Sequence, residues 1–191
     1  MANNIVLIDN NDSFTYNLVE LLRQLSCDFM VIKVGDLQLD NVAKFSHLII
    51  SPGPDVPRAY PKIYTMLSQY YRSKAILGIC LGHQIIGEFF GATTYNLATP
   101  RHGMTGKVTL APYYTSPIFA HLAPSFAVGL YHSWAIGRQN FPECLRITAT
   151  CQDGVIMAIE HVSLPIFGVQ FHPESYISAF GEQMIRNFVR L

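Results

Sequence analysis

The residue whose setting points most directly to chemistry is Cys80, in the segment Gly78-Ile-Cys80-Leu-Gly82. The buried-type apolar run Ala75–Ile79 precedes it and a helical pattern follows it, so a sharp strand-to-helix turn is expected. Glycines two residues before and after the cysteine remove the collisions that larger side chains would cause there. At a helix N-terminus, unpaired N–H groups favour the thiolate, and the N–H of Leu81 can face an oxyanion. The layout predicts a nucleophile, and a structural cysteine in a tight turn is the alternative.

A thiol nucleophile requires a base, and the segment Phe-His172-Pro173-Glu174 offers one near the other end of the chain. His172 ends an apolar run, which predicts a position at a strand tip, and Pro173 keeps His172 out of helical conformation. Glu174 is close enough to accept a hydrogen bond from the imidazole and to fix its tautomer. Cys80, His172 and Glu174 are therefore predicted to act together as nucleophile, general base and orienting carboxylate.

In the first half of the chain, short β-rich apolar runs alternate with segments of helical period. This alternation implies a parallel sheet with helices on its faces and a working site at the carboxyl ends of the central strands. The first helix is expected to be capped by Asp12 or Ser13. The expected strands are Ile5–Ile8, Phe29–Val34, His47–Ile50 and Ala75–Ile79, and the expected helices are Phe14–Leu25, Tyr60–Tyr71 and Leu81–Phe90.

The second half reads as consecutive strands with turn chemistry between them, such as Asp153-Gly154, followed by one helix. No repeat, low-complexity tract or linker interrupts the chain, so residues 1–191 are interpreted as a single α/β domain. The expected strands are Lys107–Leu110, Phe126–Leu130, Arg146–Thr150, Val155–Glu160 and Ile166–Phe171, and the expected helix is Gly181–Val189.

The composition narrows the class of partner. Half of the 191 residues are hydrophobic, enough for a buried core without disulfides or metal. Thirteen basic residues balance thirteen acidic ones, which argues against nucleic acid or an anionic membrane as the main partner. Only 14% of residues are charged, against about a quarter in an average soluble domain. A surface this poor in charge favours the interpretation that another protein covers part of it.

The cysteine pattern and the N-terminus indicate the compartment. The four cysteines show neither C-x-x-C pairing nor zinc-ligand spacing, so we expect reduced thiols, no metal and no cofactor. The opening residues lack a basic region and read as a first strand, not a signal peptide. No apolar stretch approaches the ~20 residues that span a bilayer. A soluble, cytoplasmic protein is expected.

Together, Gly78-Ile-Cys80-Leu-Gly82-His-Gln84 and Gln170-Phe-His172-Pro-Glu174-Ser resemble the class I, triad-type glutamine amidotransferases. The resemblance runs the length of the chain. The opening Leu7-Ile-Asp-Asn-Asn-Asp-Ser-Phe-Thr-Tyr-Asn17 is similar to that of the small subunit shared by anthranilate synthase and para-aminobenzoate (aminodeoxychorismate) synthase. The resemblance implies a flavodoxin-like three-layer sandwich, with a mainly parallel central sheet and a small antiparallel β element.

The resemblance also implies a mechanism and further site residues. Cys80 would attack the side-chain amide of L-glutamine, and a γ-glutamyl thioester would then be hydrolysed by water. The N–H groups of Gly53 and Leu81 would hold the oxyanion. Substrate contacts would come from Gln84 and from the backbone at Ser133 and Trp134, although Trp134 by itself reads as a core aromatic. The ammonia would pass to a separate chorismate-using synthase subunit, and the sequence leaves open which of the two products results.

Two departures from the family pattern concern tuning and partner contact. The family loop S-P-G-P-G has Asp55 in place of its last glycine, a position where φ above zero is easily adopted by glycine. Because aspartate tolerates that conformation better than most residues, we expect altered affinity for glutamine or an altered loop conformation, and not loss of activity. The segment 101–107 lacks the lysine and serine of the family's H-G-K-T-S. In the family this region lies near the synthase partner, so the departure concerns contact with the partner more than the chemistry.

Two alternatives stay open at this level. A γ-glutamyl hydrolase or an intracellular peptidase on the same fold would use the same three residues on extended substrates. A non-catalytic regulatory or scaffolding subunit is the other possibility, and retention of Cys80, His172 and Glu174 argues against it.

Overall fold

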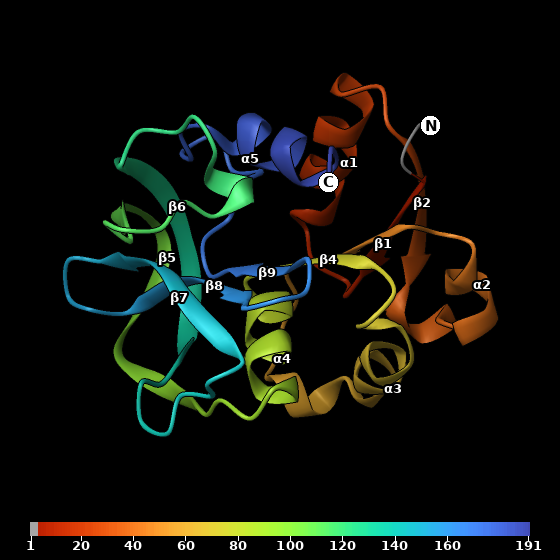
Figure 1. The fold of residues 1–191 in the computed structure, drawn as a ribbon, viewed down its shortest axis with the longest axis horizontal. Coiled ribbons are helices and arrows are strands. Elements are labelled where there is room, and N and C mark those ends of the chain that lie inside the picture. Colours follow the sequence, from red (N-terminus) through yellow and green to blue (C-terminus); the bar gives the residue numbers. More distant parts are fainter. Residues whose placement is uncertain (1–3) are drawn as a thin grey trace.

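A single mixed sheet organises the computed structural model, which describes residues 4–191 (Figure 1). Within that range the sheet has nine strands in the order β2-β1-β3-β4-β9-β8-β7-β5-β6. The neighbours from β2 to β9 pair in parallel, and those from β9 to β6 pair antiparallel. The strands are β1 Asn4–Asp9, β2 Asp28–Lys33, β3 His47–Ile50, β4 Ala75–Ile79, β5 Thr94–Leu110, β6 Ser125–Ile136, β7 Leu145–Cys151, β8 Ile156–His161 and β9 Ile166–Val169.

Helices cover both faces of the parallel half. Helices α1 and α5 lie on one face, and α3 and α4 lie on the other (Figure 1). None of the helices in the described range is long and apolar enough to cross a membrane. The helices are α1 Thr15–Gln24, α2 Leu39–Ala43, α3 Pro61–Tyr70, α4 Leu81–Phe89 and α5 Gly181–Phe188, with single 3-10 turns at Val34–Asp36, Pro57–Ala59 and Pro117–Phe119.

Alternating side chains of the central strands feed two hydrophobic cores. On β1, Leu7 joins the core shared with α1 and α5, which includes Leu18 and Phe188. Its neighbour Ile8 joins the opposite core, which includes Leu67 of α3. Because both faces are covered, the strands read as continuous apolar runs, as parallel strands typically do. The two cores fix the carboxyl ends of β1, β3, β4 and β9 side by side.

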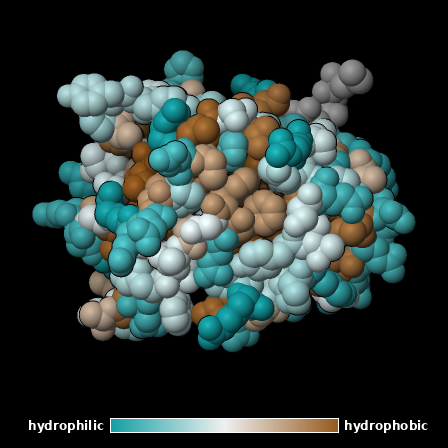
Figure 2. All heavy atoms as spheres, turned by 60° about the horizontal axis from the view of Figure 1, so that its bottom comes forward, coloured by the Kyte–Doolittle hydropathy of each residue, from teal (hydrophilic) through white to brown (hydrophobic). Residues whose placement is uncertain are grey.

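Viewed from the side that carries α3 and α4, the surface is uneven in polarity (Figure 2). Hydrophobic atoms gather near the centre of this face and hydrophilic atoms dominate its rim. At the C-terminal ends of these helices, the partly buried rings of Tyr71, Phe89 and Phe90 contact one another edge to face. These rings cover the ends of α3 and α4 without being fully enclosed.

The observed elements confirm the α/β class and most predicted strands and helices, with three corrections. The N-cap of α1 is Phe14, not Asp12 or Ser13, because Asp12 Oδ1 accepts the N–H of Phe14 at 2.8 Å in the preceding turn. Strand β9 ends at Val169, two residues before the predicted end. The antiparallel part is also more extensive than expected, because β5 and β6 extend well beyond the segments predicted for them.

Candidate active site

Cys80 lies on a sharp turn between β4 and α4, as its flanking glycines predict. Its backbone adopts φ 51° and ψ −99°, a positive-φ conformation outside the regular regions that costs energy for any residue with a Cβ. A Cβ on Gly78 would collide with the carbonyl of Gly82, and one on Gly82 would collide with the carbonyl of Ile50. The Cys80 N–H donates to the Val169 carbonyl at 2.8 Å, which anchors the turn to β9.

His172 and Glu174 form a buried pair next to this turn. The imidazole Nδ1 and Glu174 Oε1 are 2.7 Å apart, and both side chains are almost fully enclosed. The other ring nitrogen, Nε2, is also buried and makes no hydrogen bond within the described residues. Burial lowers the pKa of His172, but the nearby Cys80 thiolate and the Glu174 carboxylate outweigh it and raise that pKa well above the ordinary value. The arrangement favours the protonated imidazole next to Cys80.

The position of His172 corrects the strand-tip prediction. The residue lies three positions beyond β9, outside any strand. Its N–H donates to the carbonyl of Gly129 on β6 at 3.1 Å, forming an isolated antiparallel bridge. A Cβ on Gly129 would lie within 2.8 Å of Ser175 Oγ, so the approach of the two segments requires a glycine there. The base is therefore positioned by a strand far from it in sequence.

Two aromatic rings hold the imidazole and were not predicted. The ring centroids of Phe14 and Tyr131 lie 5.0 and 4.9 Å from that of His172, both edge to face. The two rings also contact each other at 4.6 Å, and Tyr131 Oη lies 3.0 Å from Ser175 Oγ. The available signal was Phe14, because it belongs to the opening segment that carries the family resemblance.

Cys80 opens onto a cavity of about 330 Å³. Its walls include the residues that sequence reasoning selected for the oxyanion and the substrate, whereas His172 and Glu174 do not line it. Leu81 is the first residue of α4, so its N–H has no acceptor within the helix. Gly53 packs so closely on Leu81 and Asn10 that a Cβ would lie about 2.5 Å from Leu81 Cδ2. The lining is Gly53, Pro54, Asp55, Val56, Cys80, Leu81, Gln84, His102, Tyr131, His132, Ser133 and Trp134.

Gln84 is placed at the cavity, but its amide nitrogen is already engaged. Gln84 Nε2 donates to the Trp134 carbonyl at 2.9 Å and to Gln170 Oε1 at 3.0 Å. Gln170 in turn places its own Nε2 3.6 Å from Cys80 Sγ. No role was predicted for Gln170 from its place in the motif, and the structure places it in contact with the sulfur.

Both departures from the family pattern lie at or near the cavity. Asp55 adopts φ 67°, the conformation in which a glycine is most at ease, so the expected tolerance is confirmed. On β5, His102 Nε2 lies 3.0 Å from Ser133 Oγ and faces the cavity. Its neighbour Arg101 turns the other way.

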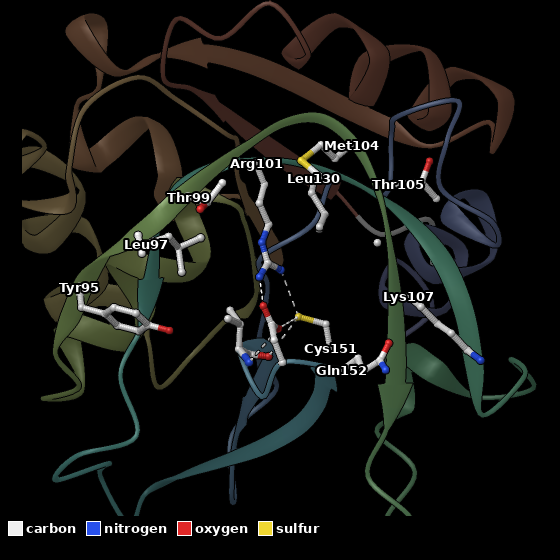
Figure 3. Close-up of a pocket in the computed structure, with 14 residues that line it drawn as sticks. Tyr95, Leu97, Thr99, Arg101, Met104, Thr105, Lys107, Leu130, Cys151 and Gln152 are labelled. Carbon is white, nitrogen blue, oxygen red and sulfur yellow. Dashed lines mark hydrogen bonds and ion pairs between the residues drawn. The ribbon is translucent and has the colours of Figure 1, made fainter.

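Arg101 lines a second and larger hollow of about 750 Å³, between β5 and the turn after β7 (Figure 3). There its guanidinium donates to Cys151 Sγ at 3.3 Å and pairs with Asp153. The Cys151 thiol there donates to Asp153 Oδ1 at 2.8 Å, but no histidine of the described range lines the hollow, so its size does not make it the better candidate for catalysis. Within the described residues, no cluster of three or more His, Cys, Asp or Glu side chains is arranged to hold a metal ion.

Comparison with known proteins agrees with this geometry. The family described as "Glutamine amidotransferase class-I" matches residues 6–191. A Haemophilus influenzae protein described as "Putative anthranilate synthase component II" is 52% identical, over 98% of this chain and 96% of that protein. The Bacillus subtilis "Aminodeoxychorismate/anthranilate synthase component 2" is 37% identical, over 97% and 95%. A Thermoplasma acidophilum structure titled "putative gmp synthase subunit a protein" superimposes with a TM-score of 0.89 at 25% identity, covering 100% of this chain and 94% of that one. The chain belongs to the class I glutamine amidotransferase family.

Proposed function

We propose that this chain is the glutaminase component of an anthranilate or aminodeoxychorismate synthase. It hydrolyses L-glutamine to glutamate and supplies the ammonia to a chorismate-using partner subunit. The observation that carries the proposal is Cys80, held at a strained turn beside the His172–Glu174 pair and open to a cavity of about 330 Å³. The names of the relatives, which describe second components of these synthases, support the choice of partner.

The first half of the reaction is acylation. The Cys80 thiolate attacks the side-chain amide carbon of glutamine, and the carbonyl oxygen becomes an oxyanion. The N–H groups of Gly53 and Leu81 are proposed to stabilise that charge. The His172 imidazolium donates its proton to the amide nitrogen, so the carbon–nitrogen bond breaks and ammonia leaves. A γ-glutamyl thioester remains on Cys80.

The second half restores the enzyme. Neutral His172 takes a proton from water as the oxygen attacks the thioester carbon, and Glu174 stabilises the imidazolium that forms again. Collapse of the tetrahedral intermediate breaks the carbon–sulfur bond, which releases glutamate and the Cys80 thiolate. This thiol must stay reduced, so the cytoplasm is the proposed compartment.

Substrate recognition is assigned to the other residues around the cavity. The backbone at Ser133 and Trp134 is proposed to hold the α-amino and α-carboxylate groups of glutamine. Gln84 supports that segment through its bond to the Trp134 carbonyl at 2.9 Å. A pocket that satisfies the polar ends of glutamine disfavours analogues that lack them, because buried partners would be left unpaired.

A pair of cysteine variants tests the proposal. Cys80→Ser is expected to lower glutamate release from glutamine by about three orders of magnitude or more, because the reactive thiolate is lost. Cys144→Ser removes a partly buried thiol that does not line the cavity, and it is expected to retain wild-type activity. Glutamate release by Cys80→Ser at the wild-type rate would refute the assignment.

A further inference from the structure

Gln170 is a fully buried polar side chain in contact with the nucleophile. Its Nε2 lies 3.6 Å from Cys80 Sγ, and its Oε1 accepts a bond of 3.0 Å from Gln84 Nε2. Because Gln84 Nε2 also donates to the Trp134 carbonyl at 2.9 Å, a continuous chain of hydrogen bonds joins that carbonyl to the sulfur. Buried amides in such a chain have few alternative partners.

The direction of this chain is fixed at one end. A backbone carbonyl only accepts, so Gln84 must turn its Nε2 toward Trp134. The same nitrogen meets Gln170, which must therefore present its Oε1 to Gln84 and its Nε2 to the sulfur. Reversing either amide would set two acceptors or two donors against each other. The side chain of Gln170 is thus held as a donor toward Cys80.

A donor aimed at sulfur has a chemical consequence. A thiolate is the better acceptor, so an N–H facing Cys80 Sγ favours the ionised nucleophile and restricts its rotation. We propose that Gln170 is a positioning residue that holds the Cys80 thiolate and links its orientation to the Ser133–Trp134 segment. This inference rests on the proposed function, because it assigns that segment to glutamine and that thiolate to the attack.

Further hydrogen bonds at both ends keep this hydrogen-bonded chain rigid. The N–H of Gln170 donates to the Met157 carbonyl of β8 at 2.9 Å, so its backbone cannot shift without breaking a sheet bond. At the other end, the Trp134 carbonyl also lies 2.8 Å from His132 Nδ1. Burial lowers the pKa of His132 to about 4, so that ring stays neutral and donates from Nδ1 at neutral pH. A change at Trp134 is therefore transmitted through Gln84 and Gln170 to the sulfur.

Two variants of Gln170 test the inference. Gln170→Glu keeps the shape and removes the N–H that faces sulfur, while Gln170→Met keeps roughly the volume and removes the polar group. The measurement is the rate of iodoacetamide alkylation of Cys80 against pH, followed by mass spectrometry of the peptide that contains it. Gln139→Glu, an exposed residue outside the cavity, is the matched control.

We expect the midpoint of the alkylation profile to move up by about one pH unit or more in both variants. Glutaminase kcat should fall by about 10- to 100-fold in both variants. In Gln170→Glu, which keeps an oxygen for Gln84 Nε2, KM for glutamine should change by no more than about twofold, because the lost interaction concerns the nucleophile. The control should match the wild type in all three quantities.

A purely structural role predicts a different result. In that case a variant with the thermal unfolding midpoint of the wild type would also show the wild-type pH midpoint of Cys80 alkylation. This outcome in either variant would overturn the inference. Failure of the proposed function is distinguishable, since it would appear as undiminished glutaminase activity in Cys80→Ser.

Discussion

His172 lies between two negative groups and two aromatic rings. Glu174 Oε1 is 2.7 Å from its Nδ1, and the negative charge of Cys80 also raises the pKa of the ring. Phe14 and Tyr131 contact it edge to face. Because the rings exclude water, the charges act at low effective dielectric and determine the protonation state. The imidazolium is therefore available as the acid that ammonia departure requires.

Glu174→Gln is expected to lower the pKa of His172. The wild-type pKa is raised well above 6.5 because negative neighbours stabilise the cation, so removing one of them must move it down. The imidazole would then lose its proton at a lower pH than in the wild type. NMR titration of the His172 ring measures this directly, and an unchanged titration midpoint would show that Glu174 has no electrostatic effect on the base.

Two variants of Asp55 separate the effect of the loop's backbone conformation on stability from the effect of the carboxylate. At φ 67°, a β-branched residue is strained, so Asp55→Val is expected to lower the free energy of unfolding by about 1–2 kcal/mol. Asp55→Gly removes the carboxylate without strain and should retain stability and glutaminase activity. Urea unfolding and glutamate release are the two measurements. Equal stability of the valine and glycine variants would contradict the strain argument.

Residue types alone identified the side chains that carry distinctive chemistry and missed those that support them. Cys80 has glycines on both sides and His172 precedes a proline, so each has a local signal. No role was predicted for Gln170, although it belongs to a motif shared with the family, or for Tyr131, because their roles depend on contacts between segments distant in sequence. The structure brings all of these residues to one site.

At the level of elements, the turn from β4 to α4 depends on Gly78. An added Cβ there would collide with the backbone of Gly82, and backbone cannot rotate away as a side chain can. Gly78→Ala is expected to lower the free energy of unfolding by about 1–3 kcal/mol or more and to slow alkylation of Cys80. Gly35→Ala is the control, since its Cβ would meet nothing within 4 Å. Comparable losses in both variants would mean that the collision is not the cause.

The parallel half of the sheet was predictable and the antiparallel half only in part. Strands β3 and β4 match their predicted bounds because both are wholly buried and read as unbroken apolar runs. Strand β5 was predicted only from Lys107, because much of Thr94–Gly106 is exposed and polar and owes its extension to pairing with β6. Helix α2 was missed because five residues are too few for a helical period.

For the whole molecule, the site joins the two halves of the sheet. Cys80 comes from the parallel half, while Ser133 and Trp134 come from β6 at the antiparallel edge. The backbone bridge between Gly129 and His172 joins β6 to the segment that carries the base. Residues nearly a hundred positions apart therefore depend on one folded sheet for their proximity, and no isolated segment would retain the chemistry.

The proposed partner leads to a prediction for the assembled complex. With the chorismate-using subunit and glutamine, the wild-type chain should support product formation, and Cys80→Ala should abolish it. Both complexes should form product equally from added ammonium salt, because that route bypasses the glutaminase. Product formation from chorismate, followed by chromatography, checks both. Loss of the ammonium-dependent reaction in Cys80→Ala would mean that the variant disturbs the partner and not the ammonia supply.

The central claim is that glutamine is cleaved through a covalent intermediate on Cys80, and it can be observed directly. The chain, with its partner subunit, is mixed with glutamine, quenched rapidly in acid, digested and analysed by mass spectrometry. The account predicts one γ-glutamyl group on the peptide that contains Cys80, and none on the peptides with Cys27, Cys144 or Cys151. Glutamate release with no adduct on Cys80, or with the adduct on another cysteine, would contradict it.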